Sequence, residues 1–193
     1  MPLLPLVKSW INPFTFKPMK IFLIGFMGSG KSFLGPRIAT ALDCPFWDLD
    51  YLIEQKAGQA ISAIFENEGE PHFRLLEKQT LQETTGITAA VISTGGGAAC
   101  FFDNMEWMNQ HGLTIYLQTP AALLAERLQA EMEHRPLLAH LSPTELITFI
   151  ENKVTEREIF YTQAQVIWDQ QKANESDWAS LIEKIRTFLP DHE

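Results

Sequence analysis

Cysteine and positive charge are both scarce in this sequence of 193 residues. Its two cysteines, Cys44 and Cys100, lie far apart, and residues 1–18 lack the basic start and the unbroken apolar stretch of a secretory signal. We therefore interpret both cysteines as thiols of a reducing compartment and not as a disulfide framework. Lys and Arg number 15 against 24 Asp and Glu, which gives a formal net charge of −9. This balance argues against a nucleic-acid partner and against an anionic membrane surface.

Long apolar runs are absent as well. The candidate for a membrane segment, residues 84–102, carries no charge, but it contains three consecutive glycines and several threonines. A bilayer-spanning helix rarely combines these residues, so we interpret the segment as a turn, a buried strand and a loop. We therefore expect a cytoplasmic protein without a membrane partner.

The length and the hydrophobic content predict one domain. Hydrophobic residues make up 46% of the sequence, which is enough for a full core in a chain of this size. Four prolines fall within the first eighteen residues, so we expect residues 1–18 to form a flexible arm and residues 19–193 to form a single domain. Residues 128–142 lie between two predicted helices and are a candidate mobile lid.

Short apolar runs alternate along the chain with longer segments of helical period. The runs predict strands at Ile21–Ile24, Phe46–Leu49, Ala90–Thr94, Thr114–Leu117 and Val166–Trp168. The predicted helices are Lys31–Leu42, Tyr51–Ala57, a long stretch that ends near Glu83, Pro120–Ala130, Pro143–Tyr161 and Ser176–Leu189. This alternation is typical of an α/β fold in which helices cover both faces of a parallel sheet.

A glycine-rich loop follows the first predicted strand. Residues 25–32 read GFMGSGKS and fit the pattern G-x-x-x-x-G-K-[ST] between a strand and a helix. In this setting backbone N–H groups and the helix N-terminus bind phosphate oxygens, Lys31 adds a positive charge, and Ser32 offers a hydroxyl to Mg²⁺. The alternative is a flexible glycine turn, which the strand before the loop and the helix after it disfavour.

Two further polar segments follow the second and third predicted strands. If Asp48 and Asp50 occupy alternate strand positions, both carboxylates project from the carboxyl end of the strand, one to serve Mg²⁺ and one a substrate hydroxyl. Helix capping by Asp50 is the alternative. Gly95, Gly96 and Gly97 follow the third strand, where backbone without side chains can approach a small polar ligand. The alternative for these glycines is a tight strand-to-helix connection.

Taken in order, these motifs resemble those of the shikimate kinase family. GFMGSGKS is followed by Asp48 and Asp50, by the segment 64–77 with its FRxxE sequence, by STGGG at 93–97, by RPLL at 135–138, and by Arg157 with Tyr161. The resemblance covers about residues 20–169. It implies a three-layer α/β/α P-loop kinase with a five-stranded parallel sheet, a helical substrate-binding region and a lid.

The resemblance also implies a reaction and a set of site residues. The reaction is transfer of the ATP γ-phosphoryl group to the 3-hydroxyl of shikimate, a step toward chorismate and the aromatic amino acids. The expected catalytic residues are Asp50, Lys31 and Arg135. The expected contacts of ATP are Gly28, Ser29, Gly30, Lys31, Ser32, Phe33, Arg127 and Arg135, and Mg²⁺ is expected at Ser32 and Asp48. The expected contacts of shikimate are Asp50, Arg74, Gly95, Gly96, Gly97 and Arg157.

Each arginine has its own expected task. Arg74 and Arg157 resemble the pair that binds the shikimate carboxylate, with Glu77 one helical turn away to hold Arg74. Arg135 resembles the lid residue that reaches the transferring phosphoryl group, and Arg127 resembles the residue that stacks on adenine. For Arg74 or Arg157 taken alone, a solvated salt bridge is the more common role of such a residue. The alternative for Arg135 is a surface arginine in a mobile loop, which the following Pro136, Leu137 and Leu138 disfavour, and Arg127 is equally plausible as an arginine on a helix surface.

The sequence departs from the family pattern in three places. Phe33 stands where the family commonly has Thr, Pro36 interrupts the start of the first helix, and residues 170–176 lack the basic, proline-containing character of the adenine-side loop. Two other functions compete with the leading hypothesis: a kinase for another small acid such as gluconate, and a catalytically silent nucleotide-binding module. We expect the protein to be a monomer.

Overall fold

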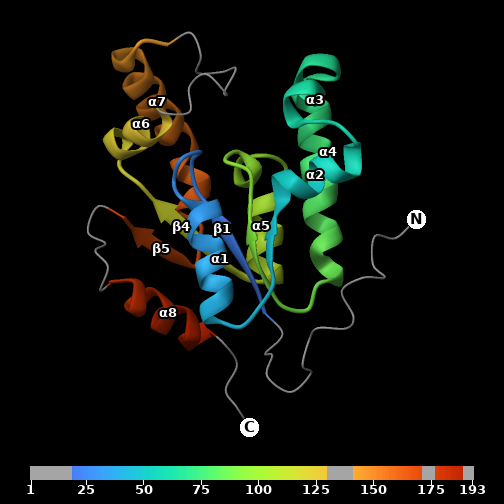
Figure 1. Ribbon diagram of the computed structural model, residues 1–193, viewed down its shortest axis with the longest axis vertical. Helices are drawn as coiled ribbons and strands as arrows, with labels where there is room; N and C mark the ends of the chain where they lie inside the picture. Colours follow the sequence, from blue (N-terminus) through green and yellow to red (C-terminus); the bar gives the residue numbers. More distant parts are fainter. Residues whose placement is uncertain (1–18, 130–140, 171–176, 189–193) are drawn as a thin grey trace.

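The computed structural model describes residues 19–129, 141–170 and 177–188, and Figure 1 shows how their helices and strands are arranged. The expected arm at residues 1–18 and residues 130–140 of the expected lid lie outside the described residues. No helix within the described ranges is long and apolar enough to cross a membrane.

Five parallel strands form one sheet in the order β2-β3-β1-β4-β5. The strands are β1 (Lys20–Ile24), β2 (Phe46–Asp48), β3 (Ala90–Ser93), β4 (Leu113–Gln118) and β5 (Val166–Asp169). All five predicted strands are confirmed, each within one residue of its predicted ends. Because the strands run in one direction, the loops that follow β1, β2 and β3 meet at the same edge of the sheet.

Eight helices connect and cover the strands in the described part of the chain. They are α1 (Lys31–Ala41), α2 (Leu49–Ala57), α3 (Ile61–Asn67), α4 (Gly69–Glu83), α5 (Asn104–His111), α6 (Ala121–Gln129), α7 (Pro143–Tyr161) and α8 (Asp177–Phe188), with two short 3₁₀ turns, η1 (Thr84–Gly86) and η2 (Ala98–Cys100). The long predicted segment that ends at Glu83 is two helices, and α4 begins just before Pro71 because proline fits the first turn of a helix. Helix α5 was not predicted.

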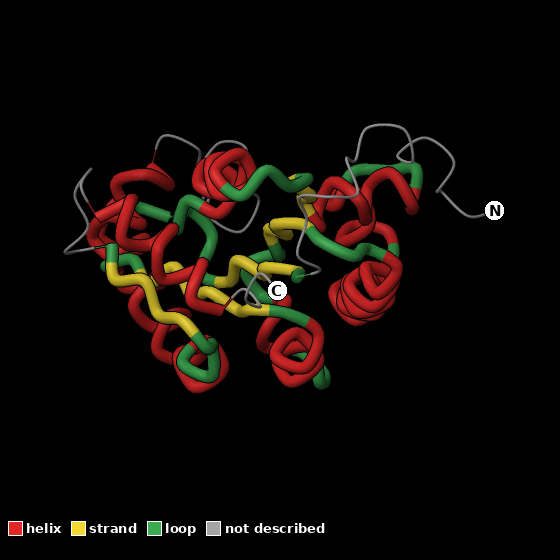
Figure 2. Tube along the Cα trace, turned by 90° about the horizontal axis from the view of Figure 1, so that it is seen from below, coloured by secondary structure: helices red, strands yellow, loops and turns green. Residues whose placement is uncertain are grey.

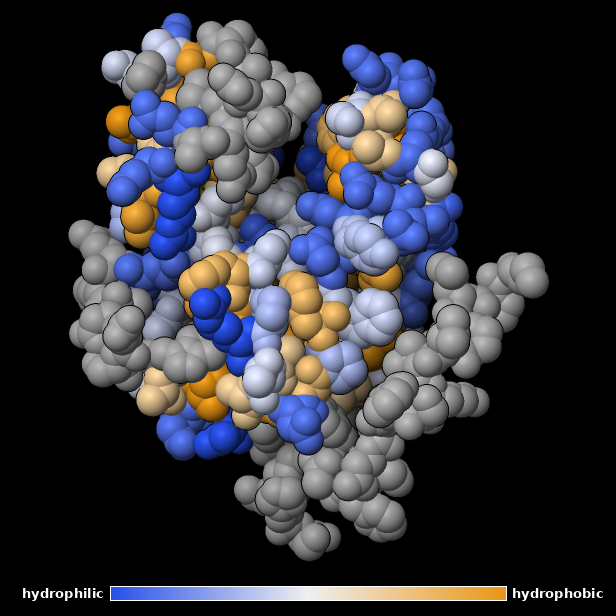
Figure 3. All heavy atoms as spheres, in the orientation of Figure 1, coloured by the Kyte–Doolittle hydropathy of each residue, from blue (hydrophilic) through white to orange (hydrophobic). Residues whose placement is uncertain are grey.

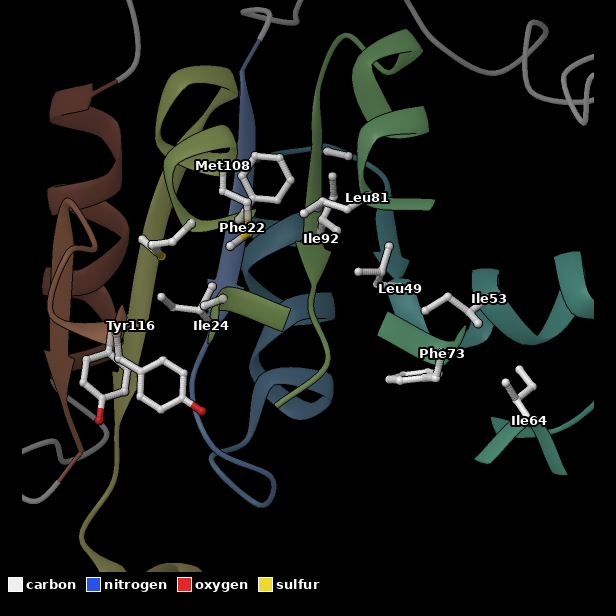
Figure 4. Close-up of a cluster of buried hydrophobic side chains, with 14 residues drawn as sticks. Phe22, Ile24, Leu49, Ile53, Ile64, Phe73, Leu81, Ile92, Met108 and Tyr116 are labelled. Atoms are coloured by element: carbon white, nitrogen blue, oxygen red, sulfur yellow. The ribbon is translucent and has the colours of Figure 1, made fainter. Parts of the chain in front are cut away.

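The sheet separates two apolar layers, because successive residues of a strand point to opposite faces. Phe22 and Ile24 of β1 pack with α2, α4 and α5 on one face (Figure 4), and Ile21 and Leu23 pack with α1 and α8 on the other. All four side chains are at most 2% exposed, and burial of each contributes about 1.5–3 kcal/mol. Figure 2 shows helices on both sides of the strands. The predicted three-layer α/β/α architecture is confirmed.

A third apolar cluster ties the glycine-rich loop to α6 and α7. Phe26 of the loop packs with Leu124 and Leu128 of α6 and with Leu146 and Ile150 of α7. Helix α7 begins at a capping box, in which the Ser142 hydroxyl accepts from the Glu145 N–H and the Glu145 carboxylate accepts from the Ser142 N–H. The predicted start of this helix at Pro143 is therefore confirmed, and its position against the loop is fixed by packing.

Both cysteines are free thiols in the structure. Burial raises the pKa of Cys44 and of Cys100 to about 11. Neither thiol is therefore ionised to a significant extent at neutral pH.

Candidate functional site

A cavity of about 810 Å³ opens at the carboxyl edge of the sheet. The glycine-rich loop forms its floor, α3 and α4 form one wall, and residues of α6, α7 and the end of β5 form the other. Figure 3 shows the surface hollowed between these two walls. Every predicted site residue within the described ranges lines this cavity except Ser29, whose side chain is buried beneath the loop. Predicted Arg135 and the RPLL sequence lie outside the described residues.

The glycine-rich loop leads directly into α1. Gly30, with φ of +90°, is the N-cap of this helix, and glycine tolerates that left-handed conformation better than other residues do. The buried Lys31 ammonium donates to the carbonyl oxygens of Gly25, at 2.8 Å, and Phe26, at 3.0 Å. A cation and a helix N-terminus are therefore placed together within the loop, which is the chemistry that phosphate binding requires.

Ser32 and Asp48 meet beside this loop. The Ser32 hydroxyl donates to Asp48 Oδ2 at 3.1 Å, and Asp48 Oδ1 accepts from the backbone N–H of Asp50 at 3.0 Å. Among the described residues no three His, Cys, Asp or Glu side chains converge to hold a metal by themselves. One hydroxyl and one carboxylate fit Mg²⁺, which commonly takes only one or two protein ligands and completes its shell with phosphates and water.

The arrangement of Asp48 and Asp50 differs from the prediction. Strand β2 ends at Asp48, and Leu49 and Asp50 already belong to α2. The expectation that both carboxylates occupy alternate strand positions is therefore wrong, and so is capping by Asp50, because Asp48 is the residue that caps α2. The reason is the free N–H groups at the start of a helix, which draw the Asp48 carboxylate. Both aspartates nevertheless line the cavity.

Asp50 lines the cavity and has one carboxylate oxygen without a partner in the described part of the chain. Its Oδ1 atom is buried and has no hydrogen-bond partner among the described residues. Burial raises the pKa of Asp50, the Asp48 charge raises it further, and Lys31 and Arg74 oppose this shift. An unpartnered buried oxygen of this kind is suited to accept a hydrogen bond from a ligand.

Arg74 of α4 is held in place from two sides. Its Nη1 atom donates to Glu77 Oε2 at 2.8 Å, and its Nη2 atom donates to Glu70 Oε1 at 2.9 Å. The guanidinium lies over the Phe101 ring, 4.1 Å from its centroid. It also lies against Gly97, where a Cβ atom would come within 2.8 Å of Nη2. The expected brace from Glu77 is present, and the glycine allows the guanidinium this close approach.

Glu77 is fully buried, at 0% exposure. Burial raises its pKa to about 7, although the neighbouring Arg74 charge lowers it. Its Oε1 atom has no hydrogen-bond partner among the described residues. Glu77 therefore adds a second carboxyl group, in addition to Asp50, beside the glycine run.

Arg157 of α7 completes this side of the cavity. Its Nη1 atom donates to the Gly96 carbonyl at 3.2 Å, and the Tyr161 hydroxyl donates to the same oxygen. Arg74 and Arg157 thus approach the glycine run from the two opposite walls. Two guanidinium groups on one concave surface can bind a small carboxylate.

The opposite end of the cavity holds Arg127 and Gln170. Arg127 of α6 donates to the Gly28 carbonyl at 3.1 Å, and it also contacts Gln170 Oε1. Gln170 was not predicted as a site residue. The available signal was its position two residues after the end of the fifth predicted strand, at the edge of the sheet where ligands bind.

Known proteins resemble this chain over most of its length. A sequence model of the shikimate kinase family matches residues 27–186. A shikimate kinase of Bacteroides fragilis is 40% identical over 175 residues, which cover 90% of this chain and 98% of that protein. The chain belongs to the shikimate kinase family.

Other shikimate kinases agree with this assignment. That of Parabacteroides distasonis is 43% identical over 171 residues, which cover 88% of this chain and 99% of that protein. Two solved structures match: shikimate kinase from Bacteroides thetaiotaomicron, with a TM-score of 0.79 and 38% identity, and shikimate kinase from Acinetobacter baumannii in complex with shikimate, with 0.75 and 35%. They cover 88% and 90% of this chain, and the chain covers 97% and 93% of theirs.

The resemblance found in the sequence is therefore confirmed, as is the α/β P-loop kinase fold. As a member of the shikimate kinase family, the chain is an ATP-dependent small-molecule kinase. Phe33, the departure after the GKS sequence, is 62% exposed and lies at the rim of the cavity.

Proposed function

We propose that this cavity binds ATP and shikimate side by side and transfers the γ-phosphoryl group of ATP to the 3-hydroxyl of shikimate. The products are shikimate 3-phosphate and ADP. One observation carries the proposal: the same cavity is lined by a P-loop, by Asp50, whose Oδ1 atom has no partner among the described residues, and by the arginine pair Arg74 and Arg157. The family membership of the chain supplies the identity of the acceptor.

The P-loop half of the cavity would hold the nucleotide. Backbone N–H groups of residues 28–32 and the N-terminus of α1 face the β- and γ-phosphates, and Lys31 exchanges its carbonyl partners for phosphate oxygens. Ser32 and Asp48 would hold Mg²⁺, which neutralises phosphate charge when it is bound. Phe33 and Arg127 border the ribose and adenine, with the Arg127 guanidinium placed to stack on the base.

The other half would hold the acceptor. Arg74 and Arg157 bind the shikimate carboxylate, and the backbone of Gly95, Gly96 and Gly97 lies against the ring. Asp50 then accepts a hydrogen bond from the 3-hydroxyl and orients its oxygen toward the γ-phosphorus. As the new P–O bond forms and the bond to ADP breaks, the hydroxyl proton passes to Asp50.

Several parts of the proposal extend beyond the described cavity. Arg135, from the lid proposed at residues 128–142, would add a positive charge to the transferring group. We also propose that residues 19–193 act as one domain, that the protein is a cytoplasmic monomer, and that it takes no nucleic-acid or membrane partner. The net charge of −9 supports the last point. Light scattering during size-exclusion chromatography measures the oligomeric state.

A coupled ADP-release assay with shikimate and Mg-ATP tests the reaction. Shikimate-dependent turnover is expected, and its absence from folded protein would reject the proposal. Gluconate serves as the competing acceptor: a preference for it would identify a kinase for another acid. Binding of ADP without turnover on either acceptor would instead favour the silent nucleotide-binding module.

A further inference from the structure

We propose that Gln170 is a positioning residue for the purine nucleotide. Its side chain holds the P-loop backbone in the orientation that binds phosphate, and it holds the Arg127 guanidinium in the orientation that stacks on the base. The inference depends on the nucleotide half of the proposed function. It assigns Gln170 no contact with the reacting atoms.

The backbone of Gln170 is anchored to the sheet. The residue follows β5 directly, and its N–H donates to the Gln118 carbonyl at 2.9 Å, which completes the pairing of Gln118 with Asp169 at the end of β4 and β5. Its side chain is half-buried and lines the cavity. Because its backbone is hydrogen-bonded to the sheet, Gln170 is held more accurately than a residue in a free loop would be, and it is a suitable fixed point.

The amide of Gln170 uses both its donor and its acceptor atoms. Nε2 donates to the Ser29 carbonyl at 2.6 Å and to the Thr119 hydroxyl at 2.8 Å. Oε1 accepts from Arg127 Nη1 at 3.3 Å and from Nη2 at 3.4 Å. This pattern fixes the orientation of the amide, because the reversed group would place its oxygen against the Ser29 carbonyl. A carboxylate at this position could not make the same contacts.

Together Gln170 and Arg127 hold two successive carbonyl groups of the P-loop. Arg127 binds the Gly28 oxygen, and Gln170 binds the Ser29 oxygen. In a trans peptide the C=O and the following N–H point in opposite directions, so the N–H of Gly30 points away from Gln170. P-loops bind phosphate through such N–H groups. Gln170 therefore fixes the direction of one of them before the nucleotide arrives.

Gln170 also sets the plane of the Arg127 guanidinium. The N–H donors of a guanidinium lie in its plane. The Gly28 carbonyl and Gln170 Oε1 occupy part of this edge. The flat faces are the surfaces that stack on an aromatic base. Arg127 is exposed, and without Gln170 its side chain would have more rotamers to lose when the nucleotide binds.

Gln170→Met tests the inference, because methionine has a similar length but no amide. We expect the Kd of ADP, measured by calorimetry without shikimate, and the KM of ATP to rise about 5- to 10-fold, which corresponds to the loss of one or two hydrogen bonds. The KM of shikimate should stay within about twofold of the wild-type value. Gln163→Met is the matched control, since Gln163 is exposed and lies just beyond the end of α7. Unchanged ADP binding, or an equal rise in both KM values, would overturn the inference.

Two further variants separate the two contacts. Gln170→Glu keeps the acceptor for Arg127, loses the donor to Ser29 and adds a negative charge near the phosphates, so ADP should bind more weakly than to Gln170→Met. In combination with Arg127→Ala, the loss caused by Gln170→Met should be less than additive. If Gln170→Glu bound ADP as strongly as the wild type does, the contact with Ser29 would be refuted. If the effects of Gln170→Met and Arg127→Ala were strictly additive, the contact with Arg127 would be refuted.

These readouts are independent of the proposed reaction. Shikimate-dependent turnover by the wild-type chain tests the function, whereas ADP binding to the Gln170 variants requires no acceptor. Either test can fail while the other succeeds. If Gln170→Met does not fold, the isosteric Gln170→Glu still tests the donor to Ser29.

Discussion

Asp50 Oδ1 and Glu77 Oε1 face the same side of Gly95: a Cβ atom built on this glycine would lie 3.0 Å from the first oxygen and 2.5 Å from the second. The two carboxyl groups come from different helices, α2 and α4, and both oxygens are buried. Two acidic groups this close resist ionising together, and the charge of Asp50 is one of the causes that raise the pKa of Glu77. The acceptor half of the cavity therefore combines two carboxyl groups with two guanidinium groups in a small volume.

Asp50→Asn should lower kcat far more than it weakens the binding of ATP. The amide keeps the size of the side chain but cannot take up the hydroxyl proton, and loss of a general base costs about 10²- to 10⁴-fold in rate. The KM of ATP should stay within about twofold, since the P-loop is untouched. Steady-state kinetics provide the measurement, with Tyr51→Phe on the exposed face of α2 as the control. Equal losses in kcat and ATP affinity would contradict the role given to Asp50.

Arg157→Ala should raise the KM of shikimate strongly and leave that of ATP nearly unchanged. A charge-assisted bond to a carboxylate contributes about 1.5–3 kcal/mol, so an increase of roughly 10- to 100-fold is expected. Lys153→Ala is the control, because Lys153 is a half-buried position on the same helix whose ammonium pairs with Glu156 and does not line the cavity. An unchanged KM of shikimate would remove Arg157 from the carboxylate site.

Gly97→Ala should also impair shikimate binding, although the glycine carries no charge. The new methyl group would lie within 3.0 Å of the Arg74 guanidinium, which must then move. Such overpacking typically costs about 1–3 kcal/mol. Gly86→Ala is the matched control, because nothing lies within 4 Å of its Cβ position. If both variants bound shikimate equally well in calorimetry, the close approach of Arg74 to Gly97 would have no consequence for the site.

Glu77→Gln should change how stability depends on pH. Burial raises the pKa of Glu77 to about 7 from the ordinary value of 4.5, so between these values the folded chain binds more protons than the unfolded chain. The contribution of Glu77 is therefore fully present below pH 4.5 and is lost as the pH rises through about 7. Relative to the variant, the wild type should lose on the order of 1–3 kcal/mol between pH 5 and pH 8.

Urea unfolding of both proteins at pH 5 and at pH 8 measures this difference. The variant is its own control, because every other titrating group is common to both chains. A difference in the free energy of unfolding that stays constant with pH would show that Glu77 does not titrate in this range.

The strands and the P-loop could be predicted because their signals are local. Buried strands such as Ile21–Ile24 are continuous apolar runs, and residues 25–32 form a contiguous motif. Helix α5 was missed because it is short and buries little: Met105 and Met108 are the apolar residues of its eight that are fully buried. A stripe of this size cannot be distinguished from a loop that carries two methionines.

The sequence predicted which residues line the site more fully than it predicted how they are arranged. The positions of Asp48 and Asp50 were recognised, but the turn that separates them depends on where β2 ends, which is among the least certain features of a sequence. The contacts of Gln170 could not be predicted either, because Ser29 is 141 residues away in the chain. Pairings across such distances are set by the fold and leave no local pattern.

The strand order also has a consequence for how such an enzyme could change its substrate. β1 carries the P-loop at the centre of the sheet, with β2 and β3 on one side and β4 and β5 on the other. Asp50 and Gly95–Gly97 follow strands of the first side, whereas Arg127 and Gln170 follow strands of the second. Mutation can therefore remodel α2, α3 and α4 for a new acceptor while the phosphoryl donor is still bound as before. Arg157, which reaches from α7 to Gly96, is the connection that such a divergence would have to preserve or replace.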